Sequence, residues 1–243
     1  NEKGEIEYAY TTSWGVSTRL IGGVIMSHSD DDGLRVPPRI APYHITIIPV
    51  VPKEETRSAI FDYADKVVAA VSGAVYANEP IRTFIDRKDI RGGEKSWNWI
   101  KKGVPIRLEV GPRDIESQSV ILLRRDKSHK DKEVVKISDL SKRIPEILEE
   151  IQNNYFIQAQ KNLEDNTVDN IKSFDELSEF LSPKNLEKPE IHGGFVRAKW
   201  CGERDTEAKL VDLKATIRCI PLEQSGSEGR CIFTGKKATT DII

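Results

Sequence analysis

The sequence predicts an α/β protein in which a mostly parallel or mixed sheet is flanked by helices and is followed by a small α+β region. Two observations predict this fold class. From residue 43 onward, short β-branched runs alternate with segments whose apolar residues recur at helical spacing, which is the pattern of βαβ units. Near residue 140 a long amphipathic segment begins, and only short strand-like runs come after it.

The first forty residues are predicted to form a strand, a turn and a helix with a proline-rich exit. Residues 6–12 alternate aromatic and small side chains as an extended segment does, and Ser17 and Thr18 can cap the helix that follows. Residues 36–42 contain three prolines, which lack a backbone donor and restrict the preceding residue, so the helix cannot continue through them. We therefore expect a domain boundary near residue 41.

The predicted sheet is built from the next eighty residues. Strands are expected at residues 44–51, 81–85, 104–110 and 119–123, and a helix at residues 54–71. In the third of these strands apolar and charged side chains alternate, which places Arg107 and Glu109 on the face opposite its apolar residues.

Ser138 is expected to cap a long helix that runs to about residue 155, in which Pro145 is tolerable only as a kink or a restart. Another helix is predicted after Ser173, because Glu176 completes a capping box with it. Strands are expected near residues 194–200 and 216–220. The predicted domains are residues 1–41, 42–149 and 150–243.

Composition restricts the classes of protein to which the chain can belong. Of its 243 residues 38% are hydrophobic and 31% charged, which suffices for two ordinary cores but leaves no membrane-spanning run. Three cysteines without a secretory or transit segment argue against a disulfide framework and for the cytoplasm, and the missing initiator Met suggests a cut end. The net charge of -2 excludes a uniformly basic protein, yet residues 82–132 carry 14 Lys/Arg against 8 Asp/Glu, where a polyanion could dock.

Arg19 lies in the first turn of the predicted N-terminal helix. A guanidinium there can bind a phosphate with the help of the helix dipole, which suits an ATP site. A capped amphipathic helix with one exposed arginine is the alternative. Gly15, Gly22 and Gly23 either allow a ligand to approach the backbone or serve only helix packing.

Residues 13–42, SWGVSTRLIGGVIMSHSDDDGLRVPPRIAP, resemble motif 3 and its exit in class II prolyl-tRNA synthetases of the archaeal/eukaryotic type. The resemblance implies that the arginine of the motif packs on adenine and reaches the ATP phosphates, while a Ser-Trp-Gly sequence forms a wall of the proline pocket. The implied residues are Arg19, as catalytic residue, with Ser17 and Thr18 for ATP, and Ser13, Trp14 and Gly15 for proline.

Residues 102–114, KGVPIRLEVGPRD, are similar to the core motif of the class II anticodon-binding domain, and the likeness extends over residues 43–149. Proline anticodons present two adjacent guanines, so Asp114 can accept from their N–H groups while Arg107 donates to O6 or N7. A salt bridge of Asp114 with Arg107 or Arg113 is the alternative. Ile100 stands where the family commonly has an acidic residue, so one base contact is missing or relocated.

Other residues near this motif are candidates for contacts with RNA. Trp97 and Trp99 could stack on unpaired bases, although their alternate spacing is more typical of strand or core residues. The candidate anticodon-binding set is Arg107, Asp114, Arg113, Lys95 and Lys130, with Lys101 and Lys127 as further phosphate contacts.

Residues 199–201 and 230–235 resemble the small zinc-binding domain that ends many members of this family, whose ligands are spaced Cys-x4-Cys and Cys-x2-Cys. Cys201 and Cys231 hold the first places of the two pairs, but Thr206 and Thr234 hold the second. Two thiolates cannot close a tetrahedral site, so we expect no zinc, and Cys219 is expected to be a buried strand residue. Apolar contacts should stabilise this domain instead, from Phe195, Val196, Trp200, Leu210, Ile217 and Ile220.

The resemblances imply part of an ATP-dependent proline–tRNA ligase that uses Mg²⁺, takes proline and proline tRNA as partners, and is a cytoplasmic homodimer at full length. Because motifs 1 and 2 are missing from the chain, the chain alone is expected to be inactive. A non-catalytic RNA-binding module is the alternative, but such a module has no use for a proline pocket. An unrelated α/β interaction domain explains neither motif.

Overall fold

The computed structural model describes residues 2–9, 11–183, 185, 187 and 194–243. Contacts within the chain divide it into two units, Asn1–Ile157 and Gln158–Ile243. Each unit has its own apolar cluster and is described separately below.

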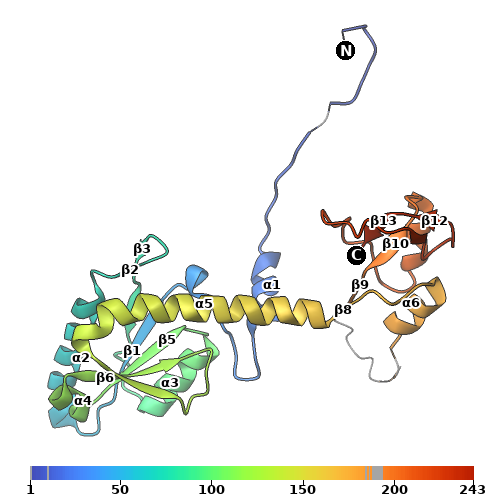
Figure 1. Ribbon diagram of the computed structural model, residues 1–243. Coiled ribbons are helices and arrows are strands. Elements are labelled where there is room, and N and C mark those ends of the chain that lie inside the picture. Colours follow the sequence, from blue (N-terminus) through green and yellow to red (C-terminus); the bar gives the residue numbers. More distant parts are fainter. Residues whose placement is uncertain (1, 10, 184, 186, 188–193) are drawn as a thin grey trace. The chain divides into compact units, whose positions relative to one another are not determined.

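A five-stranded mixed sheet forms the centre of the first unit, in the order β4-β1-β5-β6-β7 (Figure 1). Its strands are β1 (Ile45–Pro49), β4 (Thr83–Ile85), β5 (Ile106–Val110), β6 (Ser119–Arg124) and β7 (Lys132–Lys136). β1 pairs in parallel with β4 and β5, whereas β6 pairs antiparallel with β5 and β7. The predicted mixed sheet is confirmed.

Helices cover both faces of this sheet. Successive side chains of a strand point to opposite faces, so both faces carry apolar residues that the helices bury. The larger cluster joins alternate residues of β1, β5 and β6 to α2 (Arg57–Val71) and α5 (Leu140–Asp165). On the other face Ile48 packs against Trp99 of α3 (Gly92–Lys101). The shorter elements of this unit are α1 (Arg19–His28), η1 (Pro38–Ile40), η2 (Glu54–Thr56), β2 (Val75–Tyr76), β3 (Glu79–Pro80), α4 (Pro112–Ser117) and η3 (Ile137–Asp139).

Two sequence predictions for the first unit are wrong, those for residues 6–12 and for Ser138. The described residues of 6–12 form no strand. Trp97 and Trp99, which the sequence left as strand or core residues, belong to helix α3, where a spacing of two places them on different sides, and Trp99 is the core residue. Ser138 lies in η3 and shares a hydrogen bond with Asp139, so it does not cap α5, which continues through Pro145.

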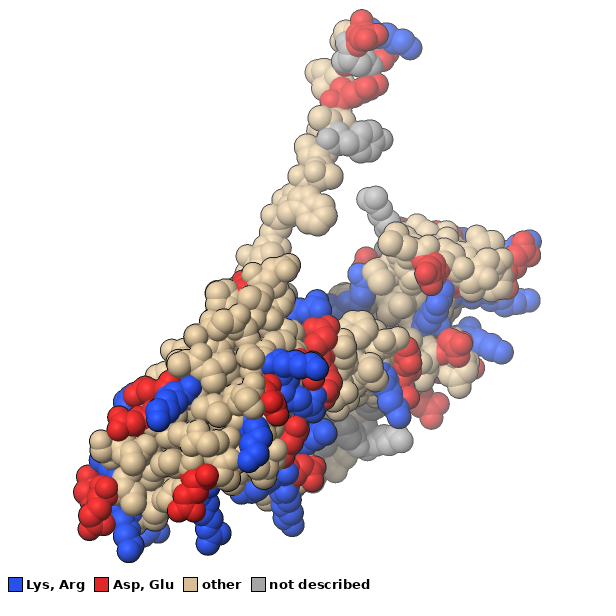
Figure 2. Space-filling model, turned by 60° about the vertical axis from the view of Figure 1, so that its left-hand side comes forward, with Lys and Arg blue, Asp and Glu red and all other residues tan. Residues whose placement is uncertain are grey.

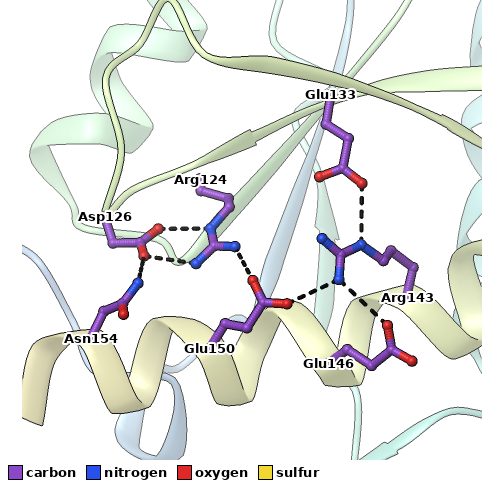
Figure 3. A network of polar contacts seen from close by, with 7 residues as sticks. All are labelled: Arg124, Asp126, Glu133, Arg143, Glu146, Glu150 and Asn154. Atoms are coloured by element: carbon purple, nitrogen blue, oxygen red, sulfur yellow. Dashed lines mark hydrogen bonds and ion pairs between the residues drawn. The ribbon is translucent and has the colours of Figure 1, made fainter.

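A polar network ties the end of β6 to α5 (Figure 3). The buried guanidinium of Arg124 donates to both carboxylate oxygens of Asp126, at 2.9 and 2.8 Å, and also pairs with Glu150. Asn154 of α5 donates to Asp126 at 2.7 Å. The remaining members are Arg143, Glu133 and Glu146.

This network should make the first unit sensitive to acid. Burial opposes ionisation of Asp126 and Glu150, but hydrogen bonds from the network's cations outweigh it and hold the pKa of both carboxyls below their ordinary values. A carboxyl whose pKa is lower in the folded chain than in the unfolded chain, where it is about 4, stabilises the folded state at pH values above about 4. This stabilisation is lost as the pH falls through the pKa of the folded state. We therefore expect the free energy of unfolding, measured with urea, to decrease steeply below about pH 4.

Asp126→Asn should remove part of this pH dependence, because the variant has no carboxylate to protonate. Asp62→Asn is the matched control, since Asp62 is an exposed carboxylate on α2. If Asp126→Asn and Asp62→Asn show the same pH profile as the parent chain, the network does not cause the acid sensitivity.

The second unit contains only short elements. Its strands pair as β8 (Thr167–Val168) with β9 (Phe195–Val196), β10 (Ala198–Trp200) with β13 (Thr240–Ile242), and β11 (Gly229–Arg230) with β12 (Lys237–Ala238). Helix α6 (Phe174–Leu181) begins as predicted, because the Ser173 hydroxyl accepts from the Glu176 N–H at 3.2 Å. A short helix, η4 (Arg204–Leu210), follows β10.

The expectations for the second unit are only partly met. Leu210 is buried, and Val196, Trp200 and Ile217 pack against the same cluster. Phe195 and Ile220 are 37% and 53% exposed and lie outside that cluster, so they do not stabilise it as expected.

The stretch 216–220 is not a strand. Among the described residues its backbone exchanges hydrogen bonds only with Ile243, through Arg218 and Cys219, and Cys219 is exposed rather than buried. One residue as a partner cannot extend a ladder. Over the chain as described, no helix combines the length and apolar character needed to cross a membrane.

Candidate functional site

The first candidate segment leads into α1. Arg19 is the first residue of this helix, and its backbone N–H lies 3.4 Å from the Ser17 hydroxyl. Thr18 occupies the N-cap position, but its side chain makes no capping hydrogen bond. Trp14 is 94% exposed, and Figure 2 shows this part of the N-terminal segment free of charged side chains. The predicted ATP and proline residues are therefore all exposed, namely Ser13, Trp14, Gly15, Ser17, Thr18 and Arg19.

The glycines of this segment have no close neighbours. A Cβ atom placed on Gly15, Gly22 or Gly23 would meet no heavy atom of the described chain within 4 Å. Packing within the described residues therefore does not explain why glycine stands at these positions.

The exit from α1 is anchored on the sheet by Arg125, a residue not identified from the sequence. Arg125 is 6% exposed, and its guanidinium donates to both carboxylate oxygens of Asp30, at 2.7 and 2.5 Å. Its Nε atom also donates to the carbonyl oxygens of Leu34 and Ile100, at 3.0 and 3.2 Å. Arg125 thus joins the α1 exit, the end of α3 and the end of β6.

Two glycines allow the α1 exit to approach the turn after α3. Gly33 and Gly103 both have positive φ, and a Cβ on either would lie within 2.7 Å of backbone atoms of the opposing segment. The close approach permits backbone hydrogen bonds from Leu34 to Lys101, 3.0 Å, and from Val36 to Gly103, 3.1 Å.

On the α3 side of the sheet, Arg107 lies between Thr46 of β1 and Leu123 of β6. Its side chain is 1% exposed. Within the described part of the chain, its Nε and Nη1 atoms and the Oγ1 atom of Thr46 are buried without a hydrogen-bond partner. Burial lowers the pKa of Arg107 to about 10, against the opposing effect of nearby Glu109. A buried cation without hydrogen bonds is unfavourable, which is typical of a group whose partner is a ligand.

Glu109 influences the pKa of both residues that the sequence predicts to read the anticodon, Arg107 and Asp114. It follows Arg107 by two positions on the same face of β5, and its charge acts on both Arg107 and Asp114. Its carboxylate also pairs with Lys132 at 3.5 Å. The sequence placed Glu109 on this face, but it gave no reason to include it in the site.

Asp114 lies in the first turn of α4 and caps it. Its Oδ2 atom accepts from the N–H of Gly111 at 2.8 Å, and burial raises the pKa of the carboxyl. Among the described residues the structure has no ion pair of Asp114 with Arg107 or with the exposed Arg113, so the alternative salt bridge is not formed. One carboxylate oxygen, Oδ1, remains for another donor.

The basic candidates separate into two groups. Lys130, Lys101 and Lys127 are exposed. Lys95 is 3% exposed and donates to the carbonyl oxygen of Asp86 at 3.1 Å, so the prediction that it contacts a phosphate is wrong for this conformation. It lies on the inner side of α3, where packing against the β4 end outweighs solvation of its ammonium group.

The tryptophans of α3 also differ from each other. Trp99 is buried and its Nε1 atom donates to Asp86 at 2.8 Å, which is a structural role. Trp97 is half-exposed and remains available for stacking.

In the second unit three of the four positions that resemble a zinc site lie together, namely Cys201, Cys231 and Thr234. The Sγ atom of Cys201 lies 3.5 Å from the hydroxyl of Thr234. Thr206 is buried, accepts from the Trp200 indole at 2.9 Å and donates to the Glu203 carbonyl oxygen at 2.5 Å. Over the described residues no three His, Cys, Asp or Glu side chains are grouped to hold a metal. Two thiols and two hydroxyls do not fit a structural zinc site.

Comparison with known proteins assigns these features to one family. A curated proline–tRNA ligase of Protochlamydia amoebophila (strain UWE25) is 52% identical over 243 residues, which are 100% of this chain and 48% of that protein. The chain belongs to the prolyl-tRNA synthetase family. The proline–tRNA ligase of Paramagnetospirillum magneticum (strain ATCC 700264 / AMB-1) is 43% identical, and the match covers 99% of this chain and 47% of that protein. The chain thus spans about half the length of the curated relatives it matches.

Family models and a solved structure agree with this membership. The anticodon binding domain model matches residues 44–147, and the model of the C-terminal domain of prolyl-tRNA synthetase matches residues 187–243. The crystal structure of prolyl-tRNA synthetase from Cryptosporidium parvum, complexed with halofuginone and AMPPNP, is 33% identical with a TM-score of 0.80, and the match covers 99% of this chain and 47% of that one. The chain therefore contains the anticodon-binding domain and the C-terminal region of a prolyl-tRNA synthetase.

Proposed function

We propose that this chain supplies the motif 3 segment and the anticodon-reading domain of an ATP-dependent proline–tRNA ligase. The observation that carries the proposal is the buried guanidinium of Arg107, whose Nε and Nη1 atoms have no hydrogen-bond partner among the described residues, within a domain that matches the anticodon-binding family. Reading a base requires this guanidinium to turn outward. Because Nε and Nη1 have no hydrogen-bond partner among the described residues, the rotation breaks no hydrogen bond made by these atoms.

The proposed division of labour follows the three predicted domains. Residues 1–41 carry motif 3, residues 42–149 read the anticodon and residues 150–243 form the C-terminal domain. Arg107 donates to guanine O6 or N7, the free oxygen of Asp114 accepts from guanine N–H groups, and Lys130 and Arg113 position the phosphates. A crystal structure of the Cryptosporidium parvum enzyme is a complex with L-proline and AMP, which supports proline and an adenine nucleotide as ligands of the full-length enzyme. For these ligands the proposal assigns the residues named by the motif 3 resemblance, namely Arg19, Ser17, Thr18, Ser13, Trp14 and Gly15.

The proposed reaction needs no protein nucleophile. Proline and ATP form prolyl-adenylate and pyrophosphate, and the prolyl group then passes to the tRNA. Mg²⁺ neutralises phosphate charge in such reactions, and no residue of this chain is assigned to it. We further propose a cytoplasmic homodimer at full length, a chain that is inactive on its own, and a C-terminal domain that folds without zinc.

The anticodon proposal is tested with Arg107→Ala and Asp114→Asn in a full-length enzyme that contains this chain. Asparagine keeps an oxygen that can accept from Gly111, so α4 stays capped while the charge is lost. Each variant should lower kcat/KM for charging of proline tRNA by about 10- to 100-fold, because a base contact contributes about 1–3 kcal/mol. Proline-dependent ATP–pyrophosphate exchange should remain close to that of the parent.

Lys142→Ala is the control for this experiment, because Lys142 is exposed on α5, which covers the opposite face of the sheet. It should charge tRNA normally. If both site variants still discriminate proline tRNA from tRNA with a changed anticodon as well as the parent does, the anticodon assignment is wrong. If the unmodified full-length protein shows no ATP–pyrophosphate exchange, the chain belongs instead to an RNA-binding module without catalysis.

A further inference from the structure

Two cysteines that are thirty positions apart in the sequence are neighbours in the second unit. Cys201 follows β10 and Cys231 follows β11, and a backbone hydrogen bond of 2.9 Å from Ile232 to Lys199 holds the two segments together. Cys231 is a buried member of the apolar cluster of this unit and Cys201 packs against that cluster, and the thiol of Cys231 interacts electrostatically with the Thr234 hydroxyl and with Cys201. The same hydroxyl lies 3.5 Å from the sulfur of Cys201, so three side chains converge on one point.

The two thiols differ in access. Cys231 is 1% exposed, whereas Cys201 is only partly buried. A reagent in solution therefore meets Cys201 first. Cys219, the third cysteine, is exposed and lies outside this pair, where its backbone pairs with Ile243.

The surroundings favour a thiolate at the buried position. Burial raises the pKa of the Cys231 thiol, but the hydroxyl of Thr234, the backbone N–H of Phe233 and the contacts with Cys201 outweigh it, and the pKa falls to about 7. Lys236, which pairs with Glu203 at 2.5 Å, adds a positive charge that acts on both sulfurs. A thiol of this kind is substantially ionised near neutral pH, and the thiolate is the reactive form.

Metal binding does not account for this arrangement. Thr206 uses its hydroxyl in hydrogen bonds to Trp200 and Glu203, so it is not free to act as a ligand. In the described part of the chain no third thiol or imidazole completes the group. Two adjacent thiols without further ligands are instead a dithiol that can be oxidised.

We propose that Cys201 and Cys231 are a modification site at which a low-molecular-weight disulfide converts the two thiols into an intramolecular disulfide. The Cys201 thiolate attacks one sulfur of the small disulfide and releases one small thiol, which leaves a mixed disulfide on Cys201. The Cys231 thiolate then attacks the Cys201 sulfur and expels the second small thiol. One reagent disulfide is consumed, one protein disulfide forms, and the two protons of the cysteines end on the two released thiols.

The test treats the 243-residue chain with oxidised glutathione at neutral pH, blocks the remaining thiols with iodoacetamide and maps the peptides by mass spectrometry. We expect a peptide pair joined through Cys201 and Cys231, with Cys219 alkylated or glutathionylated. Cys219→Ser should give the same pair. Cys231→Ser should stop at glutathionylated Cys201, and Cys201→Ser should leave Cys231 unmodified because it is buried.

Circular dichroism establishes that each variant is folded, and Cys219→Ser carries the test if the other two are not. The proposal is overturned if Cys219 is the cysteine that pairs, or if folded Cys219→Ser yields only mixed disulfides. It is also overturned if metal analysis of the untreated, chelator-washed chain finds about one zinc per chain, because both thiols would then be ligands. That last result would equally refute a zinc-free C-terminal domain.

Discussion

Replacement of Arg19 by alanine should lower proline-dependent ATP–pyrophosphate exchange by about two to three orders of magnitude in a full-length enzyme that contains this chain. Arg19 is the first residue of α1 and is exposed, so its guanidinium lies at the positive end of the helix dipole. Charge-assisted hydrogen bonds to phosphates at such a position are strong once the site excludes water.

Two further variants separate this role from a general loss of positive charge. Arg19→Lys keeps the charge but not the planar fork, so it should recover only part of the exchange rate. Arg39→Ala removes an exposed arginine that pairs with Glu149, and it should leave exchange unchanged. Exchange near the parent rate in Arg19→Ala would remove Arg19 from the ATP site, whatever the tRNA-charging variants show.

Arg125→Ala should have the largest effect on the stability of the first unit. The substitution removes the guanidinium that binds Asp30, Leu34 and Ile100. The carboxylate of Asp30 then keeps only the N–H of Asp32 as a hydrogen-bond donor among the described residues, and the Ile100 carbonyl oxygen keeps the N–H of Gly103. The side chain of Asp30 is 36% exposed, so the loss should be smaller than the roughly 3–5 kcal/mol that breaking a fully buried ion pair costs. Because Arg125 holds the α1 exit on the sheet, much of this loss should appear as local opening of residues 30–36.

Hydrogen exchange measures that opening directly. In Arg125→Ala the amide protons of Leu34 and Val36, which donate to the turn after α3, should exchange about 100-fold faster or more. Arg143→Ala is the matched control, because its ion pairs with Glu133, Glu146 and Glu150 are partly solvated and contribute about 0–1 kcal/mol. Equal exchange rates in Arg125→Ala and Arg143→Ala would show that Arg125 does not anchor the exit.

The zinc-like positions show where a motif in the sequence stops being informative. The substitutions Thr206 and Thr234 are visible in the sequence and suffice to argue against a tetrahedral zinc site. That Cys201 and Cys231 nevertheless belong to the same apolar cluster, with one buried and one partly accessible, depends on the pairing of the segments after β10 and β11. A separation of thirty residues along the sequence does not show that two side chains are close in space.

The sequence by itself determined the mixed sheet, the two covering helices of its larger apolar cluster, the capping of α6 by Ser173 and the family of the chain. These depend on the period at which apolar residues recur, on local capping chemistry or on extended motifs, all of which are properties of contiguous residues.

Tertiary structure decided that residues 97–99 are helical, that residues 216–220 are not a strand, and that Lys95 and Arg107 are buried while Cys219 is exposed. In each case the deciding partner is distant in the sequence: Asp86 for Trp99 and Lys95, Thr46 and Leu123 for Arg107, and Ile243 for Cys219. Local patterns state which side chains are apolar or charged, but burial is set by the elements that pack over them.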